Sequence, residues 1–144
     1  MKIKVESVDL PEPEVIIRGD VSSAEVIGLL QLLGKRNSGK LLVCREEEQC
    51  ILDAQEIVFL EVREGKVYAM TRADSYETRL KLYEVMEQLS GRSFVQVNKS
   101  VIVNMNCVKS IQAEFSGNYR LKLKNRPEVL TLSRKYFKAF KDSI

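Results

Sequence analysis

Three short loops in the second half of the sequence carry the side chains with the clearest chemical use. Arg63-Glu64-Gly65-Lys66 joins two strand-like segments, Asn98-Lys99-Ser100 interrupts two apolar ones, and Ser133-Arg134-Lys135 precedes a helical pattern. Guanidinium and ammonium groups bind phosphate oxygens or guanine O6 and N7, and amides and hydroxyls bind adenine or phosphate. Each loop alone fits an ordinary solvated turn. Together they predict a β scaffold that reads DNA with its loops, and spacing leaves open whether they converge on one face.

The charge of the chain is divided unevenly between its two parts. Residues 1–62 hold 7 basic and 12 acidic side chains, whereas residues 63–144 hold 16 basic and 8 acidic ones. From Arg92 onward the acids are Glu114, Glu128 and Asp142. A surface built from this stretch has a positive potential that attracts polyanions, although a merely solvated basic face has the same composition.

Residue types that most enzymes and metal sites need are missing. The 144 residues contain no histidine, which excludes Ser-His-Asp and Cys-His catalysis, imidazole acid/base chemistry and zinc sites built with histidine. Cys44, Cys50 and Cys107 are odd in number and lack C-x-x-C spacing. We expect them to be small core residues, with a redox role as the alternative. We therefore expect a protein that is not an enzyme, with no metal, no cofactor and no small-molecule substrate.

One stretch partly matches a nucleotide-binding motif. Gly34-Lys35-Arg36-Asn37-Ser38-Gly39-Lys40 matches a phosphate-binding P-loop as far as its lysine. Leu41 then stands where the motif needs a hydroxyl for magnesium, and the predicted order is helix then strand, the reverse of what aims helix N–H groups at phosphate. We expect no nucleotide binding here.

A small N-terminal extension of strand, strand and helix is predicted over residues 1–36. Residues 3–5 and 15–17 are β-type runs separated by prolines, and a helix is expected from a capping box of Ser22 and Glu25 to a stop at Gly34. Its apolar stripe consists of Val26, Leu29, Leu30 and Leu33. Such a stripe must be covered, either by the following sheet or by another subunit.

From residue 37 to residue 144 the periodicity is mostly that of strands. Hairpins are predicted from residues 41–44 with 50–52 and from residues 57–62 with 66–71, and helices over residues 82–89 and 133–144. Further strands are predicted at residues 94–97, 101–104, 108–113, 119–123 and 129–132. The predicted fold class is mostly β with short helices (α+β). Because no run of about 18 apolar residues and no signal peptide is present, we expect a soluble, cytoplasmic protein.

One segment of the basic half reads Phe94-Val95-Gln96-Val97-Asn98-Lys99-Ser100-Val101-Ile102-Val103-Asn104. It resembles the signature of LytTR-type DNA-binding domains, approximately F-x-R-(I/V)-(H/N/S)-(K/R)-S-x-(I/L)-V-N. Upstream, Ile57-Val58-Phe59-Leu60-Glu61 resembles the early strand of that family, and downstream Leu132-Ser133-Arg134-Lys135-Tyr136 resembles its late L-S-R-x-Y segment. The resemblance extends from about Gly39 to the C terminus with the spacing of the family.

The resemblance implies an elongated β-sheet domain of a bacterial transcription regulator, preceded here by the N-terminal extension. Such domains lay loops into successive major grooves of double-stranded DNA, at paired sites arranged as direct repeats, and bend the DNA. The contacting positions of the family fall on Lys99 and Arg134, with a third in the loop from Arg63 to Lys66. Asn98, Ser100 and Lys135 accompany them as further donors.

Three departures from the family pattern affect this assignment. Gln96 replaces the usual basic residue, Asn98 stands where many members have His, and Asn125-Arg126-Pro127-Glu128 replaces a tighter Asn-Gly turn. The loss of the basic residue at position 96 leaves one phosphate contact of the family open. Asn104 closes the signature, and we expect its amide to be buried against turn backbone rather than placed on DNA.

The resemblance also suggests partners. The chain has no room for the receiver domain that most members carry, so it resembles standalone regulators encoded beside a small membrane protein that restrains them. Residues 1–36 would then mediate self-association into a homodimer on DNA, or capture of that inhibitor. Two alternatives stay open: a protein-interaction module that uses exposed strands, and an enzyme, which the lack of histidine disfavours.

Overall fold

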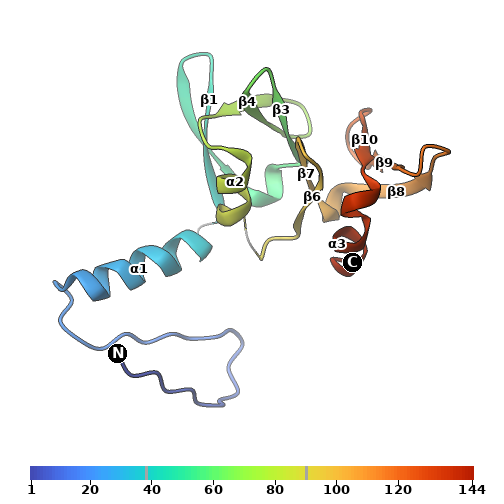
Figure 1. Ribbon diagram of the computed structural model, residues 1–144. Coiled ribbons are helices and arrows are strands. Elements are labelled where there is room, and N and C mark those ends of the chain that lie inside the picture. Colours follow the sequence, from blue (N-terminus) through green and yellow to red (C-terminus); the bar gives the residue numbers. More distant parts are fainter. Residues whose placement is uncertain (38, 90) are drawn as a thin grey trace. The chain divides into compact units, whose positions relative to one another are not determined.

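The computed structural model describes residues 1–37, 39–89 and 91–144. The chain divides into two compact units, Met1–Leu32 and Leu33–Ile144, each of which is described by itself. Figure 1 shows the elements in chain order. The predicted boundary near residue 36 stays a prediction.

The N-terminal unit contains the greater part of one helix, which continues past Leu32 into the second unit. Helix α1 spans Ala24–Asn37, and residues 1–23 form neither helix nor strand. The two strands predicted at residues 3–5 and 15–17 are therefore wrong, because a β-type run forms a strand only where a partner strand satisfies its backbone. Ile3, Val5, Val15 and Ile16 are exposed.

The ends of α1 also differ from the prediction. Ser23 caps the helix, since its Oγ accepts a hydrogen bond from Val26 N at 3.2 Å, whereas Ser22 donates to Asp20 Oδ1. The helix continues through Gly34 to Asn37, because a glycine inside a helix costs only about 1 kcal/mol.

The second unit is built on two antiparallel sheets. The larger has seven strands in the order β2-β1-β5-β4-β3-β7-β6 and the smaller three in the order β10-β9-β8. The strands are β1 Lys40–Arg45, β2 Glu48–Asp53, β3 Phe59–Arg63, β4 Lys66–Met70, β5 Ser75–Thr78, β6 Phe94–Asn98, β7 Val101–Asn104, β8 Val108–Ala113, β9 Tyr119–Leu123 and β10 Val129–Leu132. The helices are α2 Leu82–Gln88 and α3 Phe137–Asp142, with single 3-10 turns η1 Ala54–Glu56, η2 Met105–Cys107 and η3 Arg134–Tyr136.

Along the central strands, successive apolar side chains point to opposite faces of the larger sheet, so both faces are buried. On β3, Phe59 belongs to one buried cluster and Leu60 to the other, and on β7 Val103 and Ile102 alternate in the same way. The first cluster joins the larger sheet to the smaller one and to α3 through Leu121, Leu123, Leu130, Leu132 and Phe140. The second includes Val85 and Leu89, which bring α2 against the opposite face.

The predicted fold class is confirmed: the second unit is mostly β with short helices. The five strands predicted between residues 94 and 132 are present within one residue of their predicted ends, and so is the helix over residues 82–89. Strand β5 was not predicted. The charged turn expected over residues 45–49 is a two-residue turn at Glu46 and Glu47, both with positive φ, so β1 and β2 extend further toward it than the apolar pattern indicates.

Candidate nucleic-acid interface

The turn between β6 and β7 is shaped by the side chain of Asn98. Its Nδ2 donates to the carbonyl of Thr131 at 2.7 Å, and its Oδ1 accepts from Ser100 N at 2.8 Å. Gln96 Nε2 donates to the carbonyl of Asn98 at 3.0 Å. These bonds use both ends of the Asn98 amide within the protein, so Asn98 fixes the turn that carries the exposed side chain of Lys99 at its tip.

The segment of Arg134 lies beside this turn. Ser133 N donates to the carbonyl of Val97 at 2.8 Å, so β6, the edge of the larger sheet, lies against the end of β10, the edge of the smaller one. Arg134 opens η3 directly after this contact. Lys99 and Arg134, 35 positions apart in the sequence, therefore belong to adjoining segments.

The third predicted loop lies on the other side of the same turn. Val62 N donates to the carbonyl of Ser100 at 2.8 Å, and Glu61 pairs with Val101 in the register of β3 and β7. The β3–β4 turn consists of Glu64 and Gly65, with φ of 50° and 78°, the geometry of a tight two-residue hairpin turn.

The structure thus answers the question that spacing left open. Residues 63–66, 98–100 and 133–135 converge at one end of the second unit, and we call them the three-loop surface.

Charge on the three-loop surface is mostly positive and exposed. None of the ion pairs among the described residues involves Lys99, Arg134 or Lys135. Arg63 pairs with Glu61 at 3.3 Å and Lys66 with Glu77 at 3.9 Å. Such exposed pairs contribute about 0–1 kcal/mol and exchange easily for another anion.

Sequence reasoning missed two cations beside this surface. Arg120 and Lys122 are exposed on β9 and alternate with the buried Leu121 and Leu123, so they share the solvent face of the smaller sheet. Arg120 pairs in register with Thr131, whose carbonyl binds Asn98. The strict alternation of charged and apolar residues at 120–123 was the signal that could have found them.

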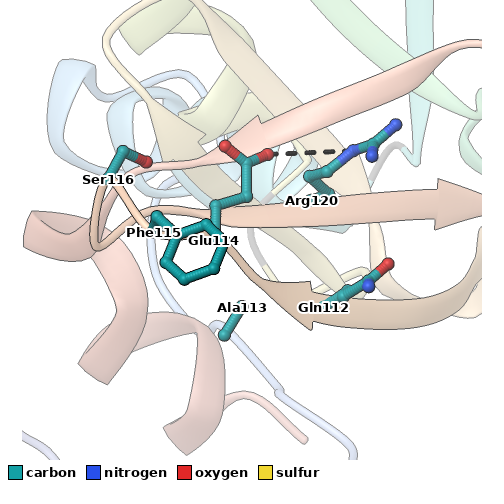
Figure 2. A pocket seen from close by; sticks show the side chains of 6 residues that line it. All are labelled: Gln112, Ala113, Glu114, Phe115, Ser116 and Arg120. Atoms are coloured by element: carbon teal, nitrogen blue, oxygen red, sulfur yellow. Dashed lines mark ion pairs between the residues drawn. The ribbon is translucent and has the colours of Figure 1, made fainter.

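A shallow hollow marks the tip of the β8–β9 hairpin (Figure 2). It is lined by Gln112, Ala113, Glu114, Phe115, Ser116 and Arg120. Glu114 Oε1 lies 3.7 Å from Arg120 Nε, and the ring of Phe115 is fully exposed. Ser116 Oγ accepts a hydrogen bond from Asn118 N at 3.3 Å, so two polar groups of the lining, Ser116 and Glu114, both have partners within the hairpin.

The remaining candidate groups are structural. Asn104 is buried, with Nδ2 donating to the carbonyl of Ile57 and Oδ1 accepting from Asn106 N, both at 3.0 Å, which confirms its predicted role. Cys50 and Cys107 pack against the two buried clusters, and burial raises the pKa of the Cys107 thiol. Ser38, within the P-loop-like stretch, lies outside the described residues.

A metal cluster and a membrane-spanning helix are both absent from residues 1–37, 39–89 and 91–144. No group of three or more carboxylate and thiol side chains there is placed to hold a metal ion. Within the same residues, no helix is long and apolar enough to cross a membrane.

Comparison with known proteins places this geometry in context. The family model of the LytTr DNA-binding domain matches residues 47–144. The sensory transduction protein LytT of Oceanobacillus iheyensis is 34% identical over 73% of this chain and 44% of its own length, and an HTH-type transcriptional regulator of Staphylococcus aureus is 30% identical over 69% of this chain and 66% of its own. The chain thus spans less than half of the LytT protein.

A solved LytTr DNA-binding domain from Bacillus cereus has the same fold. It matches with a TM-score of 0.67 over 73% of this chain and 95% of that structure, at 21% sequence identity.

Proposed function

Because the chain belongs to the LytTr DNA-binding domain family, we propose that it is a sequence-specific transcription regulator that reads double-stranded DNA in successive major grooves with loops of its β scaffold. The observation that carries the proposal is the convergence of residues 63–66, 98–100 and 133–135 at one end of the second unit. A two-stranded β element fits the major groove, which is about 12 Å wide. Loops fixed by the ends of five strands place their side chains reproducibly against the bases.

The residues take different roles within this proposal. Arg134 and Lys99 contact base edges or phosphates directly, because both are exposed cations without an acidic partner among the described residues. Lys135, Arg63 and Lys66 bind phosphates. Asn98 shapes the turn through its two internal hydrogen bonds, and Ser100 contributes chiefly backbone, which joins the turn to β3.

The finer partners of the regulator are also proposals. Residues 1–36 mediate self-association, so that two copies of the domain (residues 37–144) occupy paired sites as a homodimer and gain affinity through effective concentration. Capture of a small membrane-protein inhibitor by the same residues stays a prediction.

Selection from a randomised duplex pool tests the main proposal. Repeated selection with the full chain should enrich one consensus, called the selected site below, and the logarithm of the affinity should fall linearly with the logarithm of the salt concentration. Arg134→Ala should weaken binding to the selected site by about 1–3 kcal/mol, the value of a bidentate arginine contact to guanine.

Arg72→Ala is the matched control for that variant. Arg72 is an exposed arginine next to the end of β4 that lies opposite the β3–β4 turn, so we expect its removal to leave the affinity unchanged. A pool that stays random, or an Arg134→Ala protein that binds the selected site as the wild type does, would contradict the proposal.

One observation favours a second candidate, a protein-interaction module. Strand β2 is an open edge of the larger sheet, and Ile51 on β2 lies opposite Leu42 on β1, with 67% and 56% of their surfaces exposed. An edge of this kind can accept a strand from a partner. Binding that is insensitive to salt and lost on Ile51→Lys would favour this candidate over DNA reading.

A further inference from the structure

The first amide of η3 has a partner outside its own turn. The first N–H groups of any helical turn lack partners within it, and Ser133, the residue before η3, makes no side-chain cap. Asn118, in the loop between β8 and β9, fills this role, since its Oδ1 accepts a hydrogen bond from Arg134 N at 3.2 Å. The side chain of a distant hairpin therefore holds the backbone from which Arg134 projects.

Gly117 lies under the side chain of the same arginine. A Cβ built on Gly117 would be 3.2 Å from Arg134 Cδ and 3.3 Å from Nη1, closer than most Cβ contacts in proteins. Gly117 also has φ of 91°, a conformation that L side chains rarely adopt. The loop thus uses its glycine both to turn and to leave room for the Arg134 side chain.

The loop that carries these two residues is itself held in place. Glu114 N donates to the carbonyl of Asn118 at 3.0 Å, Gly117 N donates to the carbonyl of Glu114 at 3.1 Å, and Asn118 N donates to Ser116 Oγ at 3.3 Å. The next residue, Tyr119, stacks on Phe137 of α3 with ring centroids 4.3 Å apart. The loop and the segment of Arg134 are therefore fixed to each other at both ends of η3.

We propose that Asn118 and Gly117 are positioning residues for Arg134, so that recognition of the base pair contacted by Arg134 depends on the β8–β9 loop. The inference rests on the proposed function, since it assigns a reading role to Arg134. Asn118 fixes where the backbone of Arg134 starts, and Gly117 fixes the surface along which the side chain extends. Neither residue needs to touch DNA.

A double-mutant cycle tests this inference. Asn118→Ala, Arg134→Ala and the double variant are compared with the full-length wild type on the selected site and on random duplex, at one salt concentration. Asn118→Ala should lose about 2- to 10-fold in affinity for the selected site, the value of one hydrogen bond, and little on random duplex. It should also relax the preference at the base pair that Arg134→Ala relaxes.

The cycle distinguishes positioning of Arg134 from a direct DNA contact by Asn118 and from a role of Asn118 in folding. In the Arg134→Ala background the Asn118→Ala change should cost nothing further, because the residue it positions is gone. A loss that persists at full size in that background would overturn the inference, since Asn118 would then contact DNA itself or support the fold. An Arg134→Ala protein that binds as the wild type does would instead refute the role of Arg134 in the proposed function.

Two further variants complete the test. Asn125→Ala is the matched control, because Asn125 is an exposed asparagine of the β9–β10 loop with no side-chain hydrogen bond among those of the described residues, and it should bind as the wild type does. Gly117→Ala should lose at least as much affinity as Asn118→Ala with an unchanged circular dichroism spectrum. Wild-type affinity of Gly117→Ala would contradict the role of Gly117.

Discussion

Arg126 is expected to hold the two sheets together at the end opposite the three-loop surface. Its Nη1 donates to the carbonyl of Thr71 at 2.6 Å and to that of Asp74 at 3.3 Å, while Nε and Nη2 both lie 2.7 Å from Glu128 Oε2. Thr71 follows β4 where Met70 pairs with Phe59. Arg126 thus joins the β9–β10 loop of the smaller sheet to the β4–β5 connection of the larger one.

The magnitude follows from these contacts. The side chain of Arg126 is only 18% exposed, so its hydrogen bonds are weakly screened, and a bond to a charged group contributes about 1.5–3 kcal/mol. Arg126→Ala also leaves the carboxylate of Glu128 half-buried without its partner, and one of its oxygens is already unpaired. We expect a loss of about 3 kcal/mol in the free energy of unfolding, which lowers Tm by roughly 6–12 °C.

Urea unfolding and DNA binding together test this reasoning. Arg120→Ala is the control for stability, since its exposed pair with Glu114 spans 3.7 Å and contributes less than about 1 kcal/mol. Because Arg126 binds the carbonyls of Thr71 and Asp74, beyond the end of β4 opposite the β3–β4 turn, Arg126→Ala should keep wild-type affinity for the selected site at a temperature where it is folded. A loss of stability no larger than that of Arg120→Ala would refute the argument.

Three other predictions concern pH, the β6–β7 turn and the N-terminal segment. Hydrogen bonds from Arg126 hold the pKa of the Glu128 carboxyl below its ordinary value of 4.5. The ionised Glu128 carboxylate therefore stabilises the fold above pH 4.5, and this contribution is lost as the pH falls through the lower folded pKa. The difference in stability between wild type and Glu128→Gln should shrink between about pH 7 and about pH 3, and a constant difference would contradict this. Lys99→Ala should weaken binding to the selected site while relaxing preference at one base pair, whereas an equal loss on selected and random duplex with a shallower salt slope would show a phosphate contact only. Deleting residues 1–36 should leave half-site affinity nearly unchanged and weaken binding to a two-site duplex, whereas equal loss on both, or unfolding of the remainder, would show that the helix completes the domain core.

Much of the second unit could be predicted because its signals are local. Strands such as Tyr119–Leu123 alternate buried and exposed residues between clear turns, and helix α2 has apolar residues at helical spacing before Gly91. The missed strand β5 is short and carries Glu77 at its centre. In its pairing with β4, Thr78 lies opposite Val67 and Glu77 lies opposite Tyr68. This pairing stabilises a strand that its own composition does not indicate.

The two strands predicted near the N terminus were wrong because these segments pair with none of the described strands. Ile3 and Val5 have β-type sequence, but none of the strand pairings among the described residues includes them. A strand is a property of two segments, so a single segment cannot establish it. The helix α1 needs no such partner, because its backbone hydrogen bonds lie within one segment, and its presence was predicted correctly.

In the candidate site, too, the sequence did not reveal contacts between distant residues. Sequence alone indicated which loops carry donors and predicted Asn98 as one of them, but it did not indicate the hydrogen bond from Asn98 to Thr131, which spans 33 positions and engages that side chain within the protein. The link between Asn118 and Arg134 spans 16 positions and has no sequence signature. Long-range contacts of this kind decide whether a polar side chain in a loop faces a ligand or holds the loop.

The junction of the two sheets contributes both to the proposed DNA recognition and to the stability of the fold. The hydrogen bonds that close the edge of β6 against β10 also set the distance between the Lys99 turn and the segment of Arg134. The buried cluster beneath them, with Val97 and Leu132 fully covered, keeps that junction rigid, because a packed core has few alternative arrangements. Substitutions in this core should therefore change DNA recognition as well as stability, whereas changes at Arg126, on the far end of the same core, should change stability alone.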